Sequence, residues 1–305
     1  MNLNVFQLPT FRLAFGNALM LSVTLWVGAA AFGQETATPP PAAPKPAPTE
    51  PAKDLPAALS IVKSSIEAMG GQKAIDAIES TSIKGNIASP MMPAAINMEI
   101  KSAKGGKMFM KQELPGMGEG TAGSDGTTAW KSDPMSGGYQ LMSPEEAKQT
   151  VKRSNMYNIL FNIENEFKTL ETVDKTSFNG EECYKVRMVS EDKSVPEQMG
   201  YFSLANKLMT GLETTEEGPM GPVTTTFHFK DWKELNDVKV FSALDLERMG
   251  MNMTMTFSEV EFNKVDPAVF ELPAEVKKLV AEKQNAGGGA TPNAAPATQP
   301  APSNP

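Results

Sequence analysis

Hydrophobic residues fall at every second position through much of this chain, most regularly between residues 249 and 257. Methionine occupies positions 249, 251, 253 and 255, and the residues between are glycine, asparagine and threonine. A period of two predicts a β-strand with one apolar and one polar face. Methionine is more flexible than the valine, isoleucine and leucine of an ordinary core, so this face favours a surface that re-packs around a variable ligand.

The same alternation predicts further strands, separated by turn residues such as Asp125-Gly126 and Asn179-Gly180. In the last strand the apolar phase changes from odd positions at Phe257 to even positions at Val260, which predicts a β-bulge near Ser258 or Glu259. The predicted strands cover residues 81–87, 96–100, 108–114, 127–131, 167–178, 182–189, 198–204, 207–215, 223–232, 238–246 and 249–262.

Helical spacing appears at both ends of the chain's folded part and in its middle. Residues 59–69 carry one apolar stripe that ends at a glycine pair, and a short second helix is predicted over 72–78. Ser143 followed by Pro144 predicts a capped helix start, and this helix is expected to run to about Asn165. Residues 266–270 predict a turn that buries Phe270, before a final helix over 275–283.

Strands that alternate this cleanly are typical of antiparallel sheets rather than parallel ones, which are buried on both faces. We therefore predict an α+β fold with a single curved antiparallel sheet, a half-open barrel of about ten to eleven strands, and helices packed on its concave side.

Composition divides the 305 residues into four parts. Residues 1–33 predict a signal peptide cleaved near Gly33, with an uncleaved anchor as the alternative. Residues 34–54 are rich in proline and alanine and predict an extended disordered linker, and residues 286–305 predict a disordered tail of similar character. The folded domain is predicted over 55–285. These features favour a periplasmic or secreted bacterial protein.

Charge and cysteine content restrict the possible partners. The formal net charge is −8, which argues against nucleic acid or an anionic membrane surface as the main partner. Cys183 is the only cysteine, so the chain forms no internal disulfide.

Several short motifs, in order along residues 57–275, resemble the bacterial outer-membrane lipoprotein-sorting family of LolA/LolB-like proteins. The motifs are Glu67-Ala68-Met69-Gly70-Gly71, Ser82-Ile83-Lys84-Gly85, Asp125-Gly126-x-x-x-Trp130, Asn179-Gly180-Glu181-Glu182-Cys183-Tyr184, Gly200-Tyr201-Phe202-Ser203, Lys230-Asp231-Trp232 and Asp266-Pro267-x-x-Phe270. The resemblance implies an unclosed antiparallel sheet around an apolar cavity, lidded by helices, in which family carriers hold the acyl chains of lipoproteins. The proline-rich flanks and the lack of a cysteine near the predicted cleavage site depart from the true carriers and place the chain nearer the family's uncharacterised branch.

The alternating methionines define a candidate site. The predicted cavity wall is Met98, Met108, Met110, Met251, Met253, Met255 and Phe257, and the predicted lid is Met156, Ile159, Leu160 and Ile163. Three interpretations stay open: an ordinary filled core, a deformable wall for acyl chains or another apolar ligand, and a thioether site for Cu(I). Alternate strand residues lie about 6.6–7 Å apart, so a copper site would need methionine from a second strand.

Other motifs give little support for catalysis. Gly118 to Gly123 matches G-x-G-x-x-G, but no apolar strand precedes it, so a glycine-rich strand or loop is favoured over a dinucleotide site. His228 is the single histidine, and Cys183 has no second histidine to pair with. Adjacent glutamates such as Glu216-Glu217 are expected to be solvated surface.

We therefore predict a non-enzymatic binding protein, without metal or cofactor, that holds a lipid or lipoprotein acyl chains. It is expected to be monomeric, to bind no nucleic acid and to contact membrane or envelope proteins transiently. The main alternative is a structural or interaction module of the cell envelope with a filled core.

Overall fold

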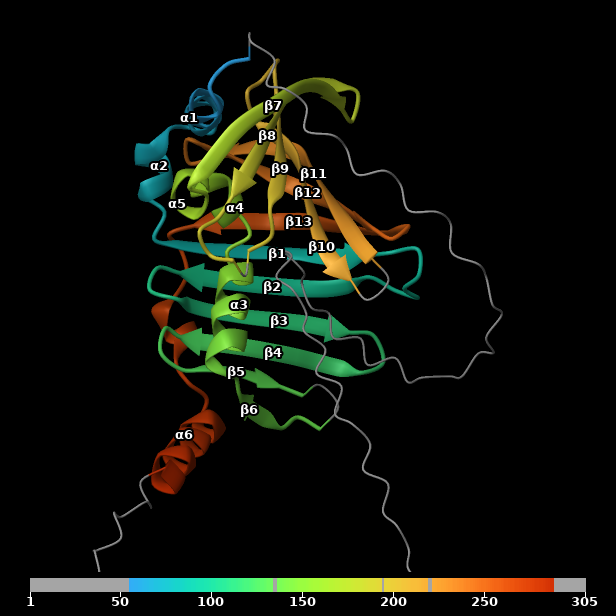
Figure 1. The fold of residues 1–305 in the computed structure, drawn as a ribbon. Helices are drawn as coiled ribbons and strands as arrows, with labels where there is room; N and C mark the ends of the chain where they lie inside the picture. Colours follow the sequence, from blue (N-terminus) through green and yellow to red (C-terminus); the bar gives the residue numbers. More distant parts are fainter. Residues whose placement is uncertain (1–54, 134–135, 194, 219–220, 288–305) are drawn as a thin grey trace, which may run out of the picture.

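Thirteen antiparallel strands form one open sheet in this computed structural model, which describes residues 55–133, 136–193, 195–218 and 221–287 (Figure 1). The predicted signal peptide, the predicted linker and most of the predicted tail lie outside these ranges. The strands are β1 Ser80–Ala88, β2 Ile96–Ala103, β3 Lys107–Leu114, β4 Gly118–Asp125, β5 Ala129–Ser132, β6 Tyr139–Leu141, β7 Thr169–Phe178, β8 Glu181–Val189, β9 Gln198–Ser203, β10 Met209–Gly218, β11 Gly221–Leu235, β12 Val238–Arg248 and β13 Met251–Phe262.

The order across the sheet is β6-β5-β4-β3-β2-β1-β13-β12-β11-β10-β9-β8-β7, so the first and last described strands of the chain pair at its centre. Neighbouring strands are also neighbours along the chain, apart from the β1–β13 pair. Strands β6 and β7 form the two edges, and the sheet does not close into a barrel. The predicted α+β class and the single curved antiparallel sheet are confirmed.

The predicted number of strands was too low. The sheet contains two strands that the alternation did not predict as separate elements, β4 and β6. Strand β4 has the sequence GEGTAGSD, which lacks the apolar period, and at one of its glycines, Gly123, an added Cβ would lie 2.6 Å from the Trp130 ring. Strand β6 has three residues and is too short for a periodic pattern.

The bulge expected in the last strand is present. Lys84 of β1 pairs with Glu259 of β13, while Gly85 pairs with Phe257, so Ser258 is the extra residue. The Ser258 hydroxyl donates a hydrogen bond to the Lys84 carbonyl at 3.2 Å. The bulge keeps Phe257 and Phe262 buried although they lie on opposite phases of the sequence.

Helices cover part of the concave face. Helix α1 (Ala58–Ala68) contacts β7 and buries Ile61, Val62 and Ile66 in the main core, and α2 (Gln72–Asp76) follows it. Helix α3 (Pro144–Ser154) lies over β2 and β3 (Figure 1). Its start is capped as predicted, because the Glu146 backbone N–H donates to the Ser143 hydroxyl at 3.2 Å.

The continuous helix predicted from Ser143 to about Asn165 was wrong. The segment breaks into α3, α4 (Asn158–Phe161) and α5 (Ile163–Glu166). Asn155 and Asn162 have non-helical backbone angles at the two breaks. The breaks change the direction of the chain, so that Tyr157 and Leu160 become fully buried against the sheet.

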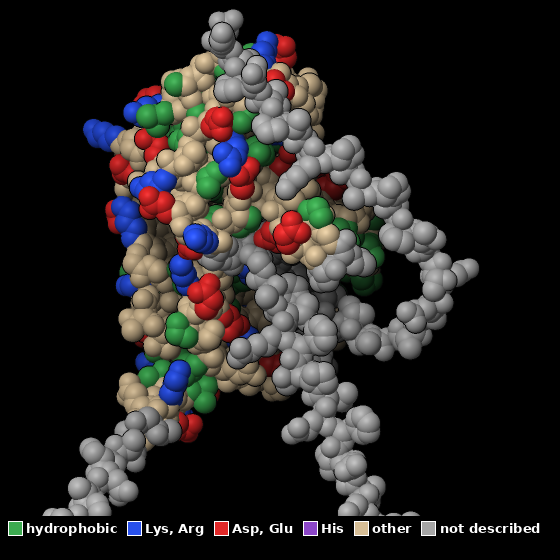
Figure 2. All heavy atoms as spheres, viewed as in Figure 1, with side chains coloured by type: hydrophobic (Ala, Val, Ile, Leu, Met, Phe, Trp, Pro, Cys, Tyr) green, Lys and Arg blue, Asp and Glu red, His purple; other side chains and the backbone are tan. Residues whose placement is uncertain are grey.

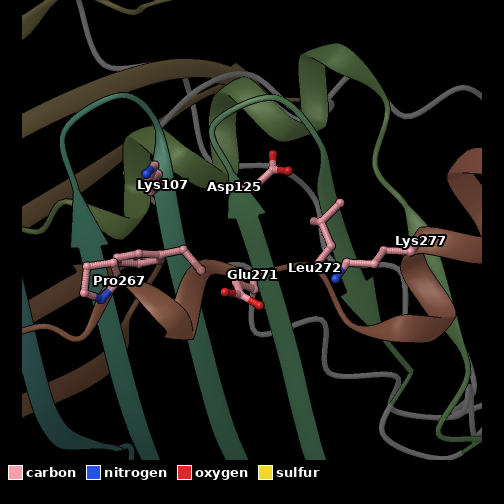
Figure 3. Close-up of a pocket in the computed structure, with 7 residues that line it drawn as sticks. Lys107, Asp125, Pro267, Glu271, Leu272 and Lys277 are labelled. Carbon is pink, nitrogen blue, oxygen red and sulfur yellow. The ribbon is translucent and has the colours of Figure 1, made fainter.

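The C-terminal segment packs on the opposite face of the sheet from α3. The 3-10 helix η1 (Pro267–Phe270) contacts β3 and β4, and α6 (Ala274–Gly287) contacts β6 (Figure 3). Phe270 is buried, as the turn pattern predicted. None of the helices in the described ranges has the length and apolar composition of a membrane-crossing segment.

Candidate functional site

The predicted methionine wall follows β13 from its exposed start into the core. Met249, in the turn before the strand, is 62% exposed and Met251 is 45% exposed, whereas Met255 is 1% exposed. Met253 is half-buried between them. The intervening Asn252, Thr254 and Thr256 are exposed on the other face, so the alternation read from the sequence is present. We call Met249, Met251, Met253 and Met255 the methionine track.

The other predicted wall residues lie on the same face as the track. Ile87 of β1 is opposite Met255, and Gly85 is opposite both Phe257 and Met98, which places these side chains on one side of the sheet. Met98, Met108 and Phe257 are buried, and Met110 is half-buried against the main core. The registers therefore bring together residues from β2, β3 and β13 that are far apart in sequence.

The predicted lid residues pack onto this face. Met156, Leu160 and Ile163 are buried and Ile159 is half-buried, and all four belong to or pack against the main core. This end of the concave face is filled by side chains in the present conformation. Whether the wall and lid open for a ligand stays a prediction.

The sequence interpretation missed the residue that fixes the lid. Tyr157 is fully buried, and its ring packs edge-on against Phe241 at 5.0 Å between centroids and against Phe257 at 6.5 Å. The Tyr157 hydroxyl donates to the Phe241 carbonyl at 3.0 Å. Burial raises the pKa of Tyr157 well above its usual value, so the hydroxyl keeps its proton.

A polar group of residues lies beside the exposed end of the methionine track. Arg248 Nη1 lies 3.7 Å from Glu216 Oε2 and donates to the Thr225 hydroxyl at 3.1 Å. Burial raises the pKa of Glu216, and the charges of Arg248 and Arg153 oppose this rise. The pKa of Arg153, on α3, is itself lowered by burial.

The expectation that Glu216-Glu217 is a solvated pair was therefore wrong for one member. Adjacent strand residues point to opposite faces, so Glu217 is exposed while the Glu216 side chain is only 13% exposed on the concave face. The local sequence gave no indication of this, because the partner arginine lies on another strand.

Solved structures with a similar architecture are known. A LolA superfamily protein from Nitrosomonas europaea is 13% identical, and the match covers 72% of this chain and 99% of that one with a TM-score of 0.50. A DUF1329 family protein from Desulfovibrio piger ATCC 29098 is 10% identical, and the match covers 70% of this chain and 97% of that one with a TM-score of 0.52. This chain has the LolA-type fold. The resemblance inferred from the short motifs is thus confirmed at the level of the fold. No protein-family model and no curated protein matches the sequence.

Two hollows lie on the surface of the LolA-type domain, away from the methionine wall. The first, of about 300 Å³, lies between the C-terminal segment and the ends of β3 and β4, and charged side chains such as Lys107, Asp125 and Glu271 line much of it (Figure 3). The second, of about 370 Å³, lies between α1 and the lid helices and includes Ile163 of the predicted lid. Neither is lined by a predicted wall residue.

His228 and Cys183 lie on the other face of the LolA-type sheet. Phe178 stacks on Tyr201 and on His228, with ring centroids 4.0 Å and 5.1 Å apart, and Asn179 Nδ2 lies 2.7 Å from His228 Nδ1. Cys183 is buried, and burial raises its pKa, which disfavours the reactive thiolate. This arrangement is a packed aromatic cluster on the opposite side from the methionine track.

Metal and nucleotide sites find no support at the positions that the sequence suggested. The G-x-G-x-x-G match lies within strand β4 rather than in a loop before a helix. Among the described residues, no three histidine, cysteine, aspartate or glutamate side chains are close enough to hold a metal ion together. Figure 2 shows acidic and basic side chains interspersed over the face with the helices, without a large field of one sign.

Proposed function

We propose that this protein is an exported, non-enzymatic binding protein that holds the acyl part of a lipid or lipoprotein on the concave face of its sheet. The observation that carries the proposal is the methionine track. Its side chains pass from 45% exposed at Met251 to 1% exposed at Met255 along one face of β13. A flexible apolar path from solvent into the core suits a chain of variable length.

Ligand entry would require the lid to move. Leu160 and Ile163 occupy the space above the sheet, and Tyr157 ties the lid to β12 through the Phe241 carbonyl. An acyl chain would replace these apolar contacts with its own. Binding would gain about 25 cal/mol for each Å² of additional apolar surface removed from water, before the entropic cost of association.

The LolA-type fold supports the same proposal, because the sorting carriers after which it is named act in the bacterial envelope. The apolar run and small residues within 1–33 favour export to the periplasm. Transient contact with membrane or envelope proteins would supply and remove the ligand.

Lipid extraction from natively purified protein tests the proposal. We expect native mass spectrometry of the full chain to detect co-purified lipid, and fluorescent fatty acids to bind with a saturable signal. Protein that is consistently free of lipid and does not respond to fluorescent fatty acids would rule the carrier function out.

The filled lid region supports the second candidate, a structural module of the envelope. Leu160 and Met255 are as buried as any core residue. The two functions differ in whether ligand can displace the lid.

The described registers disfavour the copper alternative. The neighbours directly opposite Met255 are Leu244 and Ile87, and Met253 is opposite Leu246. Met110 is likewise opposite Ile100 and Ala122. In the described strands, no two methionines are direct cross-strand neighbours, the arrangement that would most easily bring two thioethers to one ion.

A further inference from the structure

Three buried polar atoms gather on the concave face without a hydrogen-bond partner in the described part of the chain. They are Gln198 Oε1, Thr214 Oγ1 and Glu216 Oε1, out of five such atoms in the described residues. Thr214 is 2% exposed and Gln198 is 7% exposed. Folded proteins pair nearly all buried polar atoms, so three unpaired atoms at neighbouring positions require a specific explanation.

These atoms belong to a group of polar side chains that crosses the sheet, which we call the polar row: Gln198, Thr214, Glu216, Thr225 and Arg248. Direct cross-strand pairing connects, from β9 to β13, Gln198, Thr214, Thr225, Arg248 and Met251. Glu216 lies two residues beyond Thr214 on the same side of β10. Neighbouring strands are about 4.8 Å apart, so the whole row is longer than one head group. The three unpaired atoms, however, lie on the adjacent strands β9 and β10, and Arg248 Nη1 reaches to 3.7 Å from Glu216 Oε2.

The next row toward the core is apolar throughout. It consists of Gly200, Leu212, Phe227, Leu246 and Met253. The concave face therefore changes from polar to apolar between one row and the next, and the methionine track crosses that boundary between Met251 and Met253. An amphiphilic molecule lying along the track would place its polar end on the polar row.

The chemistry of the unpaired atoms restricts that polar end. Gln198 Oε1 and the Glu216 carboxylate are acceptors, and Arg248 already donates to Thr225 and lies beside Glu216. Unpaired acceptors need N–H or O–H donors from the ligand. A simple carboxylate offers acceptors only, so it would leave Gln198 Oε1 and Glu216 Oε1 without a donor.

We propose that the polar row of Gln198, Thr214, Glu216, Thr225 and Arg248 binds the polar end of an amphiphile that carries hydroxyl or ammonium donors, while its acyl chain follows the methionine track. This inference rests on the proposed function and adds the chemical class of the ligand. The preferred ligand is a hydroxyl- or amine-bearing lipid rather than a free fatty acid.

Matched ligands test the donor requirement on the unmodified full-length protein. Lauroyl lysophosphatidylethanolamine and lauroyl lysophosphatidylcholine share chain, phosphate and glycerol and differ in their N–H donors. Monolaurin and methyl laurate are the uncharged pair, and they differ in hydroxyl donors. Dissociation constants are measured by displacement of a fluorescent fatty acid, below the concentrations at which the lipids form micelles.

We expect the donor-bearing member of at least one pair to bind about tenfold more tightly, since hydrogen bonds to charged groups are among the stronger ones. The phospholipid pair reports ammonium recognition, and the uncharged pair reports hydroxyl recognition. Equal affinities within both pairs, or tighter binding of free laurate than of the donor-bearing lipids, would overturn the inference while leaving the carrier function intact. Failure of every acyl ligand to bind would instead remove the carrier function itself.

Two neighbouring variants locate the effect. Glu216→Gln removes the charge on the concave face, and Glu217→Gln makes the same change on the exposed outer face. We expect Glu216→Gln to weaken the binding of both lipids of the phospholipid pair, but that of the ethanolamine lipid several-fold more, so that its preference falls, and Glu217→Gln to leave the ratio of the two affinities unchanged. An equal loss for both lipids in Glu216→Gln would show that Glu216 does not recognise the N–H donors and would contradict the inference.

Discussion

Replacing the methionines of the track by alanine, one at a time, distinguishes a ligand path from a filled core. The changes are Met251→Ala, Met253→Ala and Met255→Ala, which lie on one face of β13 at successive depths. The three variants make the same chemical change in the same strand, so they differ mainly in how deeply the methionine is buried. We expect the loss of stability to rise steeply with depth.

The structure sets the size of each effect. Met255 is fully buried between Leu244 and Ile87, which are themselves buried, so the surroundings cannot easily collapse into the space left by alanine. A methionine-to-alanine change at such a site costs about 2–5 kcal/mol of unfolding free energy. Met251 is 45% exposed, and its replacement should cost no more than about 0.5 kcal/mol. Met253 should fall between these values.

The assay is urea unfolding followed by circular dichroism at 25 °C, combined with uptake of a fluorescent fatty acid. Met251→Ala should weaken uptake at nearly unchanged stability if the track admits ligand. Met199→Ala is the control, because Met199 packs against the aromatic cluster on the other face and should leave uptake unchanged. A Met251→Ala variant as destabilised as Met255→Ala, or a Met255→Ala variant that loses less than about 1 kcal/mol, would refute the depth argument.

Three further changes test separate contacts. Gly211→Ala should lower the unfolding free energy by about 1–3 kcal/mol, measured by thermal or urea unfolding, because the added Cβ would lie 2.1 Å from the Phe178 ring and 2.7 Å from the Phe227 carbonyl oxygen; an unchanged midpoint would contradict this. Tyr157→Phe should lower the unfolding free energy by about 0.5–1.5 kcal/mol and speed ligand uptake in stopped-flow fluorescence, because it removes the hydrogen bond to Phe241 while keeping the ring. Burial lowers the pKa of His228, so folding favours the neutral imidazole. This contribution to the stability of the folded state is therefore fully present above the ordinary histidine pKa of 6.5 and falls as the pH drops through the lower pKa of the folded state. His228→Gln should show a smaller loss in urea midpoint on acidification than the unmodified protein.

The alternation of side chains predicted the central part of the fold because burial acts residue by residue along a strand. The track residues are buried or exposed in the expected order, and the bulge at Ser258 follows from a single phase change. Strand β4 was predicted only as a glycine-rich strand or loop because GEGTAGSD has no apolar alternation, and the close approach of Trp130 to Gly123 is visible only once the strands are paired. The break at Asn162 was hidden because the apolar spacing of the lid continues through it, from Leu160 to Ile163.

The candidate site was predicted in its apolar half and missed in its polar half. Methionines at every second position identify a face from local sequence alone. The polar row depends on pairing between β9, β10, β11 and β12, whose paired residues are up to 23 positions apart in the chain at Thr225 and Arg248. From the local sequence alone Glu216 therefore resembles one member of a solvated pair, and only the strand register shows that it lies beside Arg248.

The contrast between the two halves bears on how a carrier of this kind would discriminate ligands. At the lid, Tyr157 and Leu160 already fill the face, so an acyl chain exchanges one set of apolar contacts for another and gains little from its chemical identity. At the polar row, unpaired acceptors gain full hydrogen bonds only from a ligand with donors, and an acceptor-only ligand leaves them buried and unsatisfied. Affinity would then depend on chain length and lid opening, whereas selectivity would depend on the polar end. A protein that kept this face only as a solid core would gain nothing from the unpaired Gln198 Oε1 and Thr214 Oγ1, and replacing these two residues with apolar ones of similar size would stabilise it.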